Sequence, residues 1–312
     1  MKRLEFGVRL KNYGPWTTIK EAAIAAEKNG FASIWLNDHL LPPAGPPDVP
    51  FREAWTSLSA LGTITRTIQL GTLVACNSFR NPALLAKMSS TLDIITEGRV
   101  VLGIGAGWHR PEYDAYGFAY PTIGERMARL EETVRIIKMM FRDGKATFQG
   151  KYYTVKDAPS IPVPKHKVPV WIGGGGPRLV RMAARLADGW NCYRMRLDEF
   201  KTRQASFEQE LKRAGRDSKD VTISLVTDGM VSSSKSDVER LIEAAAFERG
   251  QARDRYRVDD SAIIGNGAEA ARRIRDYRAA GASHLILNFP STGLIDQLEY
   301  FGAEVIPDSS SI

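Results

Sequence analysis

The chain has 312 residues, of which 43% are hydrophobic and 25% are charged, and its formal net charge is +7. This composition is ordinary for a globular protein with a large core and argues against a disordered chain. No apolar run reaches the roughly 18 residues of a membrane span, no signal peptide precedes the first predicted strand, and the basic residues form no stripe interleaved with aromatic ones, so we expect a cytoplasmic protein with neither a membrane nor a nucleic-acid partner.

Short β-branched runs alternate with amphipathic helices along the whole chain. Strands are predicted at residues 4–9, 31–36, 68–75, 100–104, 168–172, 189–192, 221–227 and 283–289. The clearest helices between them are predicted at residues 18–30, 51–64, 82–95 and 124–141. Eight strands alternating with helices predict an α/β fold of the (β/α)8 TIM barrel type, with residues 1–312 forming a single domain.

Four insertions are expected in this barrel, near residues 41–50, 108–121, 146–166 and 228–262. The first is rich in proline, which is incompatible with a helix interior, and is predicted to be a loop over the barrel mouth. The second is predicted to be an aromatic loop, and the third contains a hairpin. The fourth is Ser-rich and charged with one good helix, and we interpret it as a further insertion or lid.

Cysteine and histidine usage limits the chemistry. Cys76 and Cys192 are the only cysteines, and two buried reduced thiols are expected rather than a disulfide in a cytosolic protein. There are four histidines and no cluster of histidine and carboxylate at metal-ligand spacing, so no metal site is expected. The positive net charge indicates either a solvated surface or attraction of an anionic ligand.

Asp38 and His39 follow the second predicted strand. In a (β/α)8 barrel the chemistry takes place at the carboxyl ends of the strands. Histidine titrates near neutrality, so an imidazole at this position can donate or abstract a proton. The alternative is a histidine that only caps the next loop through hydrogen bonds. We favour a catalytic role for His39 with Asp38.

Two glycine clusters follow later strands. Gly105, Ala106 and Gly107 precede Trp108 and do not form a dinucleotide fingerprint, but such small residues allow a flat ring to lie against the backbone.

The second cluster, Gly174, Gly175 and Gly176, stands before a predicted helix that carries Arg178 near its start. Bare backbone N–H groups, a helix N-terminus and a guanidinium together predict a phosphate site. A tight turn that needs only glycine conformations is the alternative. No acidic residue follows about 20 positions later, which argues against a Rossmann NAD site.

Two further groups of residues are candidates for ligand contacts. Asn77, after the third strand, can hydrogen-bond the edge of a heterocycle, whereas Cys76 has no evident basic partner that would make it a nucleophile. Trp108, His109 and Tyr113 either pack their loop down or cover an apolar substrate pocket.

In combination these residues resemble the luciferase-like monooxygenase superfamily. The resemblance rests on IWLNDH at residues 34–39, the continuous run at 71–117, FQGKYY at 148–153 and the glycine-rich run at 169–191. It is close over residues 6–191 and looser in the last third. Within the superfamily, the segment GAGWHRPEYDAYGF is most similar to the branch of oxidoreductases that use the deazaflavin coenzyme F420.

The resemblance implies hydride transfer between F420 and a small, fairly apolar organic substrate, usually in a homodimer. It places the reactive face of the ring by His39 and Asp38, and a non-prolyl cis peptide between Leu73 and Val74 behind the ring. The other implied cofactor contacts are Cys76 and Asn77 at the ring edge, Gly105, Ala106 and Gly107 along the ring, and Gly174, Gly175, Gly176 and Arg178 at the phosphate.

The resemblance also leaves an alternative, an FMN-dependent two-component monooxygenase supplied by a separate flavin reductase. The positive charge slightly favours F420, whose phosphodiester and oligoglutamate tail is strongly anionic. Some deazaflavin dehydrogenases of this family carry a glutamate where this chain has Trp108. A sugar-phosphate dehydrogenase activity is therefore not expected, and acid–base chemistry is assigned to His39.

Overall fold

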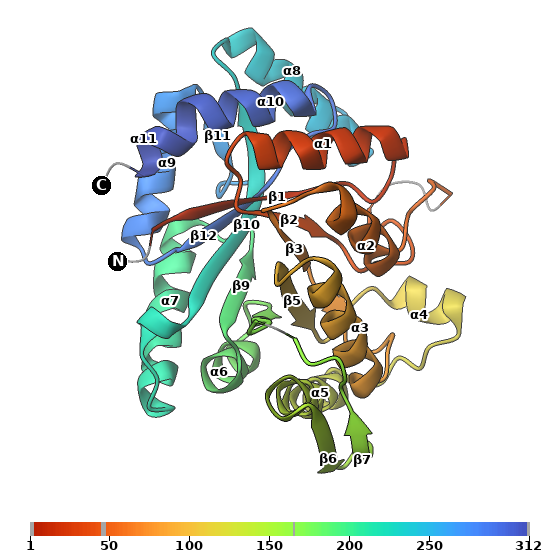
Figure 1. Ribbon diagram of the computed structural model, residues 1–312. Helices are drawn as coiled ribbons and strands as arrows, with labels where there is room; N and C mark the ends of the chain where they lie inside the picture. The colour runs from red at the N-terminus through yellow and green to blue at the C-terminus, as the bar shows by residue number, and fades with distance from the viewer. Residues whose placement is uncertain (1–2, 45–47, 165, 311–312) are drawn as a thin grey trace.

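The computed structural model describes residues 3–44, 48–164 and 166–310, and its centre is a closed barrel of parallel strands (Figure 1). In barrel order the strands are β1 (Glu5–Arg9), β2 (Ser33–Leu36), β3 (Gln69–Thr72), β5 (Val100–Gly105), β8 (Val170–Gly173), β9 (Gly189–Tyr193), β10 (Thr222–Val231) and β12 (His284–Asn288). Pairing of β12 with β1 and of β9 with β10 closes the sheet. The predicted (β/α)8 barrel is confirmed.

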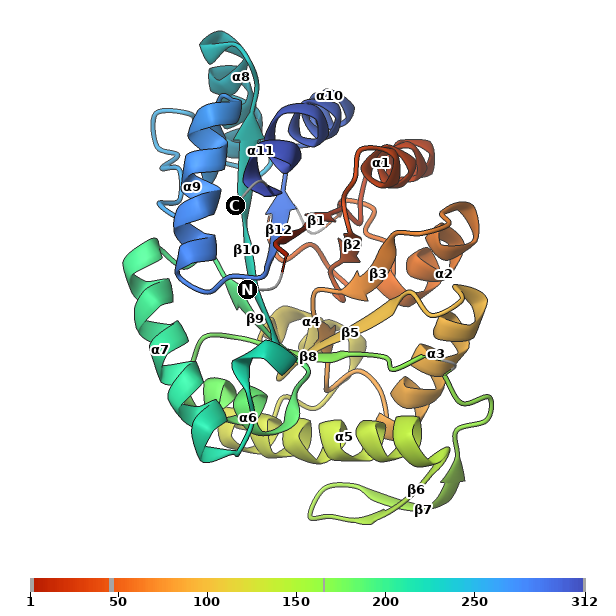
Figure 2. The same cartoon turned by 60° about the vertical axis from the view of Figure 1, so that its left-hand side comes forward.

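Helices surround the barrel, as the view in Figure 2 shows. They are α1 (Trp16–Lys28), α2 (Ala54–Ile64), α3 (Pro82–Ile95), α4 (Arg110–Tyr116), α5 (Ile123–Asp143), α6 (Pro177–Leu186), α7 (Leu197–Arg213), α8 (Lys235–Phe247), α9 (Gly267–Ala279), α10 (Leu294–Tyr300) and α11 (Ile306–Ser310). Local chemistry sets their starts. Asn81 caps α3 with Pro82 in the first turn, and the carboxylate of Glu53 accepts hydrogen bonds from two N–H groups of α2. That cap explains why α2 begins at residue 54 and not at residue 51.

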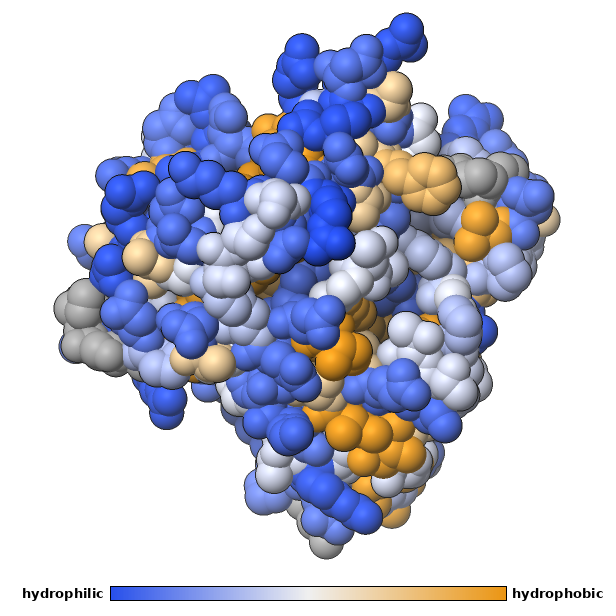
Figure 3. Space-filling model, turned by 90° about the horizontal axis from the view of Figure 1, so that it is seen from above, coloured by the Kyte–Doolittle hydropathy of each residue, from blue (hydrophilic) through white to orange (hydrophobic). Residues whose placement is uncertain are grey.

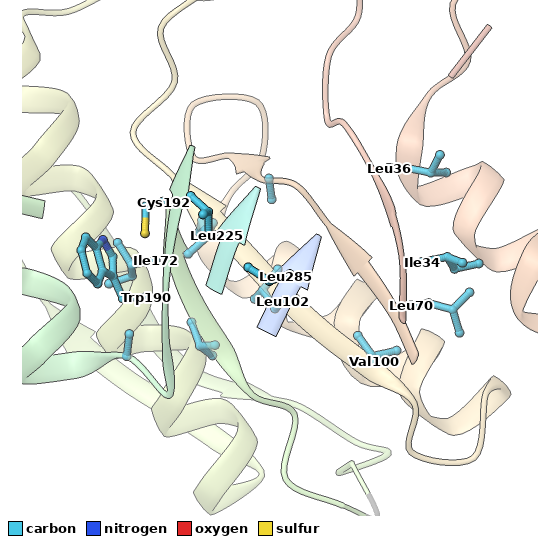
Figure 4. Packing of buried hydrophobic residues seen from close by; sticks show 14 of the residues in the cluster. Ile34, Leu36, Leu70, Val100, Leu102, Ile172, Trp190, Cys192, Leu225 and Leu285 are labelled. Carbon is cyan, nitrogen blue, oxygen red and sulfur yellow. The ribbon is translucent and has the colours of Figure 1, made fainter. Parts of the chain in front are cut away.

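The main core lies between the strands and the helices. Alternate strand residues point outward into it, among them Ile34, Leu70 and Leu102, which are fully buried (Figure 4). The surface of the molecule differs from this core: the side seen in Figure 3 is mostly hydrophilic, with apolar residues gathered in the lower half of the view.

A second, smaller core fills the inside of the barrel. It consists of Trp35, Val101, Trp171, Val226 and Ile286. The rings of Trp35 and Trp171 have centroids 4.9 Å apart. A Cβ at Gly7 would lie 2.7 Å from Trp35 Nε1, so only glycine leaves room for this ring. This inner core fills the barrel below its mouth, so a ligand that enters the barrel is confined to the carboxyl ends of the strands.

Two predicted elements differ in the structure. The strand predicted at residues 68–75 is split into β3 and a short β4 (Ala75–Cys76), and the peptide bond between Leu73 and Val74 is cis, as the resemblance implied. The aromatic loop predicted at residues 108–121 contains helix α4, because a proline lies in its first turn and Gly117 ends it in the left-handed region (φ 74°).

The segments predicted as insertions contain regular elements at two places. Strands β6 (Lys145–Gln149) and β7 (Thr154–Pro159) form the predicted hairpin. The segment at 228–262 is less separate than predicted, because β10 continues to Val231 and pairs with β11 (Ile263–Gly265) beyond it. Residues 45–47 of the loop predicted at 41–50 lie outside the described residues.

Candidate active site

A cavity of about 470 Å³ opens at the carboxyl ends of the barrel strands. The predicted site residues on its wall are Asp38, His39, Leu73, Val74, Cys76, Gly107, Trp108 and Gly174. The structure therefore brings together residues that the chain spreads over more than 130 positions. The other predicted residues lie around this wall and not on it: Asn77, Gly105, Ala106, His109, Tyr113, Gly175, Gly176 and Arg178.

His39 is held by a carboxylate that the sequence did not single out. Its Nδ1 lies 2.9 Å from Oε2 of Glu112 on α4, and the other oxygen of Glu112 accepts hydrogen bonds from the backbone N–H groups of Leu40 and Leu41. Burial would raise the pKa of Glu112, but the hydrogen bond and charge of His39 and the two N–H groups outweigh it, so the pKa is lowered. An ionised Glu112 can only accept this hydrogen bond, so Nδ1 of His39 carries the proton and Nε2 of the neutral imidazole is unprotonated.

Two aromatic neighbours surround the imidazole. Trp108 and His109 meet the ring of His39 edge to face, with centroids 5.7 and 5.9 Å away. Burial lowers the pKa of His109. The charge of Glu112 opposes this effect, and the charge of His39 adds to it. Trp108 is 61% exposed and lines the cavity, so it stands at the entrance beside His39.

Asp38 is held by hydrogen bonds to both of its carboxylate oxygens. Both of its oxygens accept hydrogen bonds from Arg80, at 2.6 and 2.9 Å, and one also accepts from the N–H of Cys76. Arg80 in turn binds Glu53, the cap of α2. Burial raises the pKa of Asp38, and the charge of Arg80 opposes this effect. Asp38 thus ties the end of β2 to β4 and α2.

Cys76 has the properties of a packed thiol. It lies 3.2 Å from the hydroxyl of Tyr113, a fully buried side chain. Burial raises the pKa of Cys76 to about 11, so the thiol is neutral at physiological pH. Both cysteines are buried and free, as predicted.

The glycines in and directly after β5 make room for neighbouring side chains. A Cβ at Gly105 would lie 2.8 Å from Val74, and one at Gly107 would lie 2.0 Å from the hydroxyl of Tyr113. Gly103 and Gly173 are similarly close to Val74. The glycine cluster therefore allows Val74 to sit within the barrel mouth, where it forms an apolar part of the cavity wall.

The second glycine cluster leads into α6. Gly174 is fixed on both sides, since its N–H donates to Asn191 and its carbonyl accepts from Trp190 Nε1. Gly176 caps the helix and Arg178 lies in the first turn, and both are exposed. A Cβ on Gly176 would meet nothing within 4 Å, so there is open space at the N-terminus of α6.

The wall formed by β1, β10 and β12 carries cations that the sequence did not identify. Lys11 binds Glu248 and Asn288, each at 2.9 Å, and Arg249 binds both oxygens of Asp228. Burial, followed by the charge of the neighbouring Arg9, lowers the pKa of Lys11 to about 8.

Within residues 3–44, 48–164 and 166–310, no group of three or more His, Cys, Asp or Glu side chains could hold a metal ion, and no helix is long and apolar enough to cross a membrane.

A family model described as luciferase-like monooxygenase matches residues 4–284. The chain belongs to this family. An F420-dependent glucose-6-phosphate dehydrogenase of Amycolatopsis mediterranei is 28% identical to it, over 98% of each chain. The enzyme of the same name from Microbacterium testaceum is 30% identical, over 97% of each chain.

The fold is also that of solved structures. An F420-dependent secondary alcohol dehydrogenase, solved in complex with an F420-acetone adduct, superposes with a TM-score of 0.87 over 99% of each chain, at 24% sequence identity. This similarity supports the luciferase-like barrel and its orientation of the strand ends.

Sequence reasoning on this luciferase-like chain missed the partners of its site residues. Glu112 lies 73 positions from His39, and Arg80 lies 42 positions from Asp38. The one available signal for Glu112 was its position in the first turn of a helix that has a proline in that turn, directly after the aromatic motif. For Arg9 the signal was a charged residue at an inward-facing strand position.

Proposed function

We propose that the chain is an F420-dependent oxidoreductase that exchanges hydride between the deazaflavin and an alcohol or carbonyl group of a small organic substrate. The observation that carries the proposal is the His39–Glu112 pair on the same cavity wall as Leu73 and Val74. Curated relatives of similar length that use F420 support the choice of cofactor.

The residues present fit a flat heterocycle with a phosphate. The cavity has the volume of a typical small-molecule site, and Leu73, Val74 and Val226 provide apolar wall. The amide of Asn77 is buried with neither end hydrogen-bonded, but Asn77 does not line the cavity, so its predicted contact with the ring edge is not part of this fit. The open N-terminus of α6, with Arg178, provides the anion site.

When bound, the deazaflavin accepts or supplies the hydride, because it has carbon where a flavin has N5. His39 handles the proton. With Nδ1 held by Glu112, Nε2 can accept the proton of a substrate hydroxyl in oxidation or return it to a carbonyl oxygen in reduction. Asp38, bound to Arg80, has a positioning role: it holds the backbone of Cys76 beside the cavity.

Three further expectations remain predictions: that the protein is a homodimer, that it is located in the cytoplasm, and that it has no nucleic-acid partner. The fairly apolar substrate expected from the sequence is not retained, because Arg9, Lys11 and Arg249 line the cavity. The relatives named above are sugar-phosphate dehydrogenases, and a phosphorylated substrate is compatible with these cations.

Titration of the purified protein with oxidised F420 and, separately, with FMN tests the proposal, with fluorescence quenching as the readout. We expect tight binding of F420 and weak binding of FMN. The reverse preference would overturn the proposal in favour of the FMN-dependent monooxygenase, whose reduced flavin would come from a separate reductase.

A further inference from the structure

Arg9 stands out among the cations of the cavity. It occupies the last position of β1. Because side chains alternate along a strand, Arg9 lies on the same inward side as Gly7. Gly7 has no side chain and so leaves room for the ring of Trp35 in the inner core. The Arg9 side chain therefore enters the mouth of the barrel directly above the inner core, where it lines the cavity.

The partners of Arg9 leave its charge unbalanced. Its Nε is buried and has no hydrogen-bond partner. One of its terminal amino groups donates a hydrogen bond to the side-chain oxygen of Asn37 at 3.3 Å. In this orientation of the Asn37 amide, its nitrogen donates to the backbone carbonyl of Leu73. Within the described residues, no carboxylate forms an ion pair with Arg9. Arg9 is half-buried, and a buried guanidinium N–H without an acceptor is uncommon in proteins.

The neighbouring cations differ in this respect. Lys11 has Glu248, and Arg249 has Asp228, which also pairs with Arg194. These pairs use the carboxylates of this wall, so none is left for Arg9. The excess of positive charge is consistent with the lowered pKa of Lys11, to which Arg9 contributes after burial.

Arg9 is also close to the reacting end of the site. β1 pairs with β2, and Asn37, which receives the hydrogen bond from Arg9, is two residues before His39. A small molecule could therefore place one group against His39 and a second group against Arg9.

We propose that Arg9 forms an oxyanion subsite and that the substrate of the proposed reaction is a small hydroxy or oxo compound bearing a carboxylate or phosphate. A carboxylate or phosphate would accept hydrogen bonds from the Nε and the terminal amino groups of the guanidinium. This inference rests on the proposed function for the reaction, but the binding of the anion by Arg9 can be tested without turnover.

The test is calorimetric titration of acetate and of inorganic phosphate into the protein saturated with F420. We compare the wild type with Arg9→Gln, Arg9→Lys and a distant surface control, Arg135→Gln. We expect one oxyanion site whose affinity falls at least tenfold in Arg9→Gln, is partly restored in Arg9→Lys and is unchanged in the control. The stronger of the two probes distinguishes a carboxylate-bearing from a phosphate-bearing substrate.

A wild-type protein that binds neither probe, or an Arg9→Gln variant with unchanged affinity, would overturn the inference. So would a loss of F420 affinity in Arg9→Gln with no loss of oxyanion binding, because Arg9 would then serve the cofactor. If F420 itself does not bind the wild type, the proposed function fails, and titration of the cofactor-free protein still gives the result for Arg9.

A second measurement avoids variants that fold poorly. Phenylglyoxal modifies accessible arginines, and mass spectrometry can follow the peptide that contains Arg9 in the wild-type protein. We expect phosphate or acetate to slow this modification at least threefold, with no effect at Arg135. Equal rates with and without the oxyanions would contradict the subsite.

Discussion

Two walls of one cavity carry charge in different ways. On the wall with His39, each charge has a partner within 3 Å: Glu112 for His39, and Arg80 for Asp38. On the wall with β1, Lys11 and Arg249 are paired, but Arg9 keeps a buried Nε without a partner. Paired charges fix the position of reacting groups, whereas a guanidinium without a carboxylate can bind a ligand of opposite charge.

The first way to test the paired wall is to remove Arg80. Arg80→Met leaves Asp38 buried without its cation, and we expect the free energy of unfolding to fall by about 3–5 kcal/mol. Urea denaturation followed by circular dichroism measures the loss. Arg135→Met, which removes an exposed ion pair, should cost less than about 1 kcal/mol. A similar small loss in Arg80→Met would show that the Asp38 pair does not brace this wall.

The catalytic role of the paired wall depends on His39. His39→Ala should lower turnover by about 100-fold or more, as expected when acid–base help is lost. F420 affinity should stay within a few-fold, since other residues would hold the ring. Steady-state rates followed by the absorbance of F420 and fluorescence titration measure the two effects. Unchanged turnover would remove His39 from the mechanism.

The reactivity of the Cys76 thiol shows whether the wall with His39 contains a nucleophile. Its pKa is raised from 9.0 to about 11, so at pH 8 the reactive thiolate is about 100-fold rarer than in the unfolded chain. Alkylation by iodoacetamide, followed by mass spectrometry, should be slower by at least that factor in the folded protein. The rate should rise with pH up to about 11. A rate equal to that of the urea-unfolded protein would contradict the burial of this group.

Glu112 is predicted to act through His39. Glu112→Gln keeps the shape but loses the charge that orients the imidazole, and we expect turnover to fall about tenfold. KM and F420 affinity should change little, whereas a structural collapse would alter both. Glu112→Asp, which retains the carboxylate, should recover part of the rate. Equal rates in Glu112→Gln and the wild type would show that His39 needs no orienting partner.

An effect of similar size is expected at the phosphate end. Arg178→Ala should weaken F420 binding by about tenfold, which is the lower end for a charge-assisted hydrogen bond. Arg181→Ala on the same helix is the matched control and should bind F420 like the wild type. If both variants bind normally, the phosphate lies elsewhere on the cavity rim.

The barrel and the strand-end residues were predictable because they depend on local patterns. Strand runs ending in polar or glycine residues place Asp38, His39 and Gly174 at one mouth, whatever the details of packing. The split of the third strand was not predicted. The family resemblance implied only the cis peptide between Leu73 and Val74, which lies at the split. Helix α4 was missed because an aromatic-rich stretch was interpreted as a loop.

The sequence by itself determined the fold and the identity of the residues at the strand ends. Only the tertiary structure decided which charges meet. Glu112 reaches His39 from a different βα unit, and Arg80 reaches Asp38 in the same way. Arg9 remains without a carboxylate because Glu248 and Asp228 bind other cations. Charge pairing is decided across the closed barrel, between residues far apart in the chain, and no local pattern encodes it.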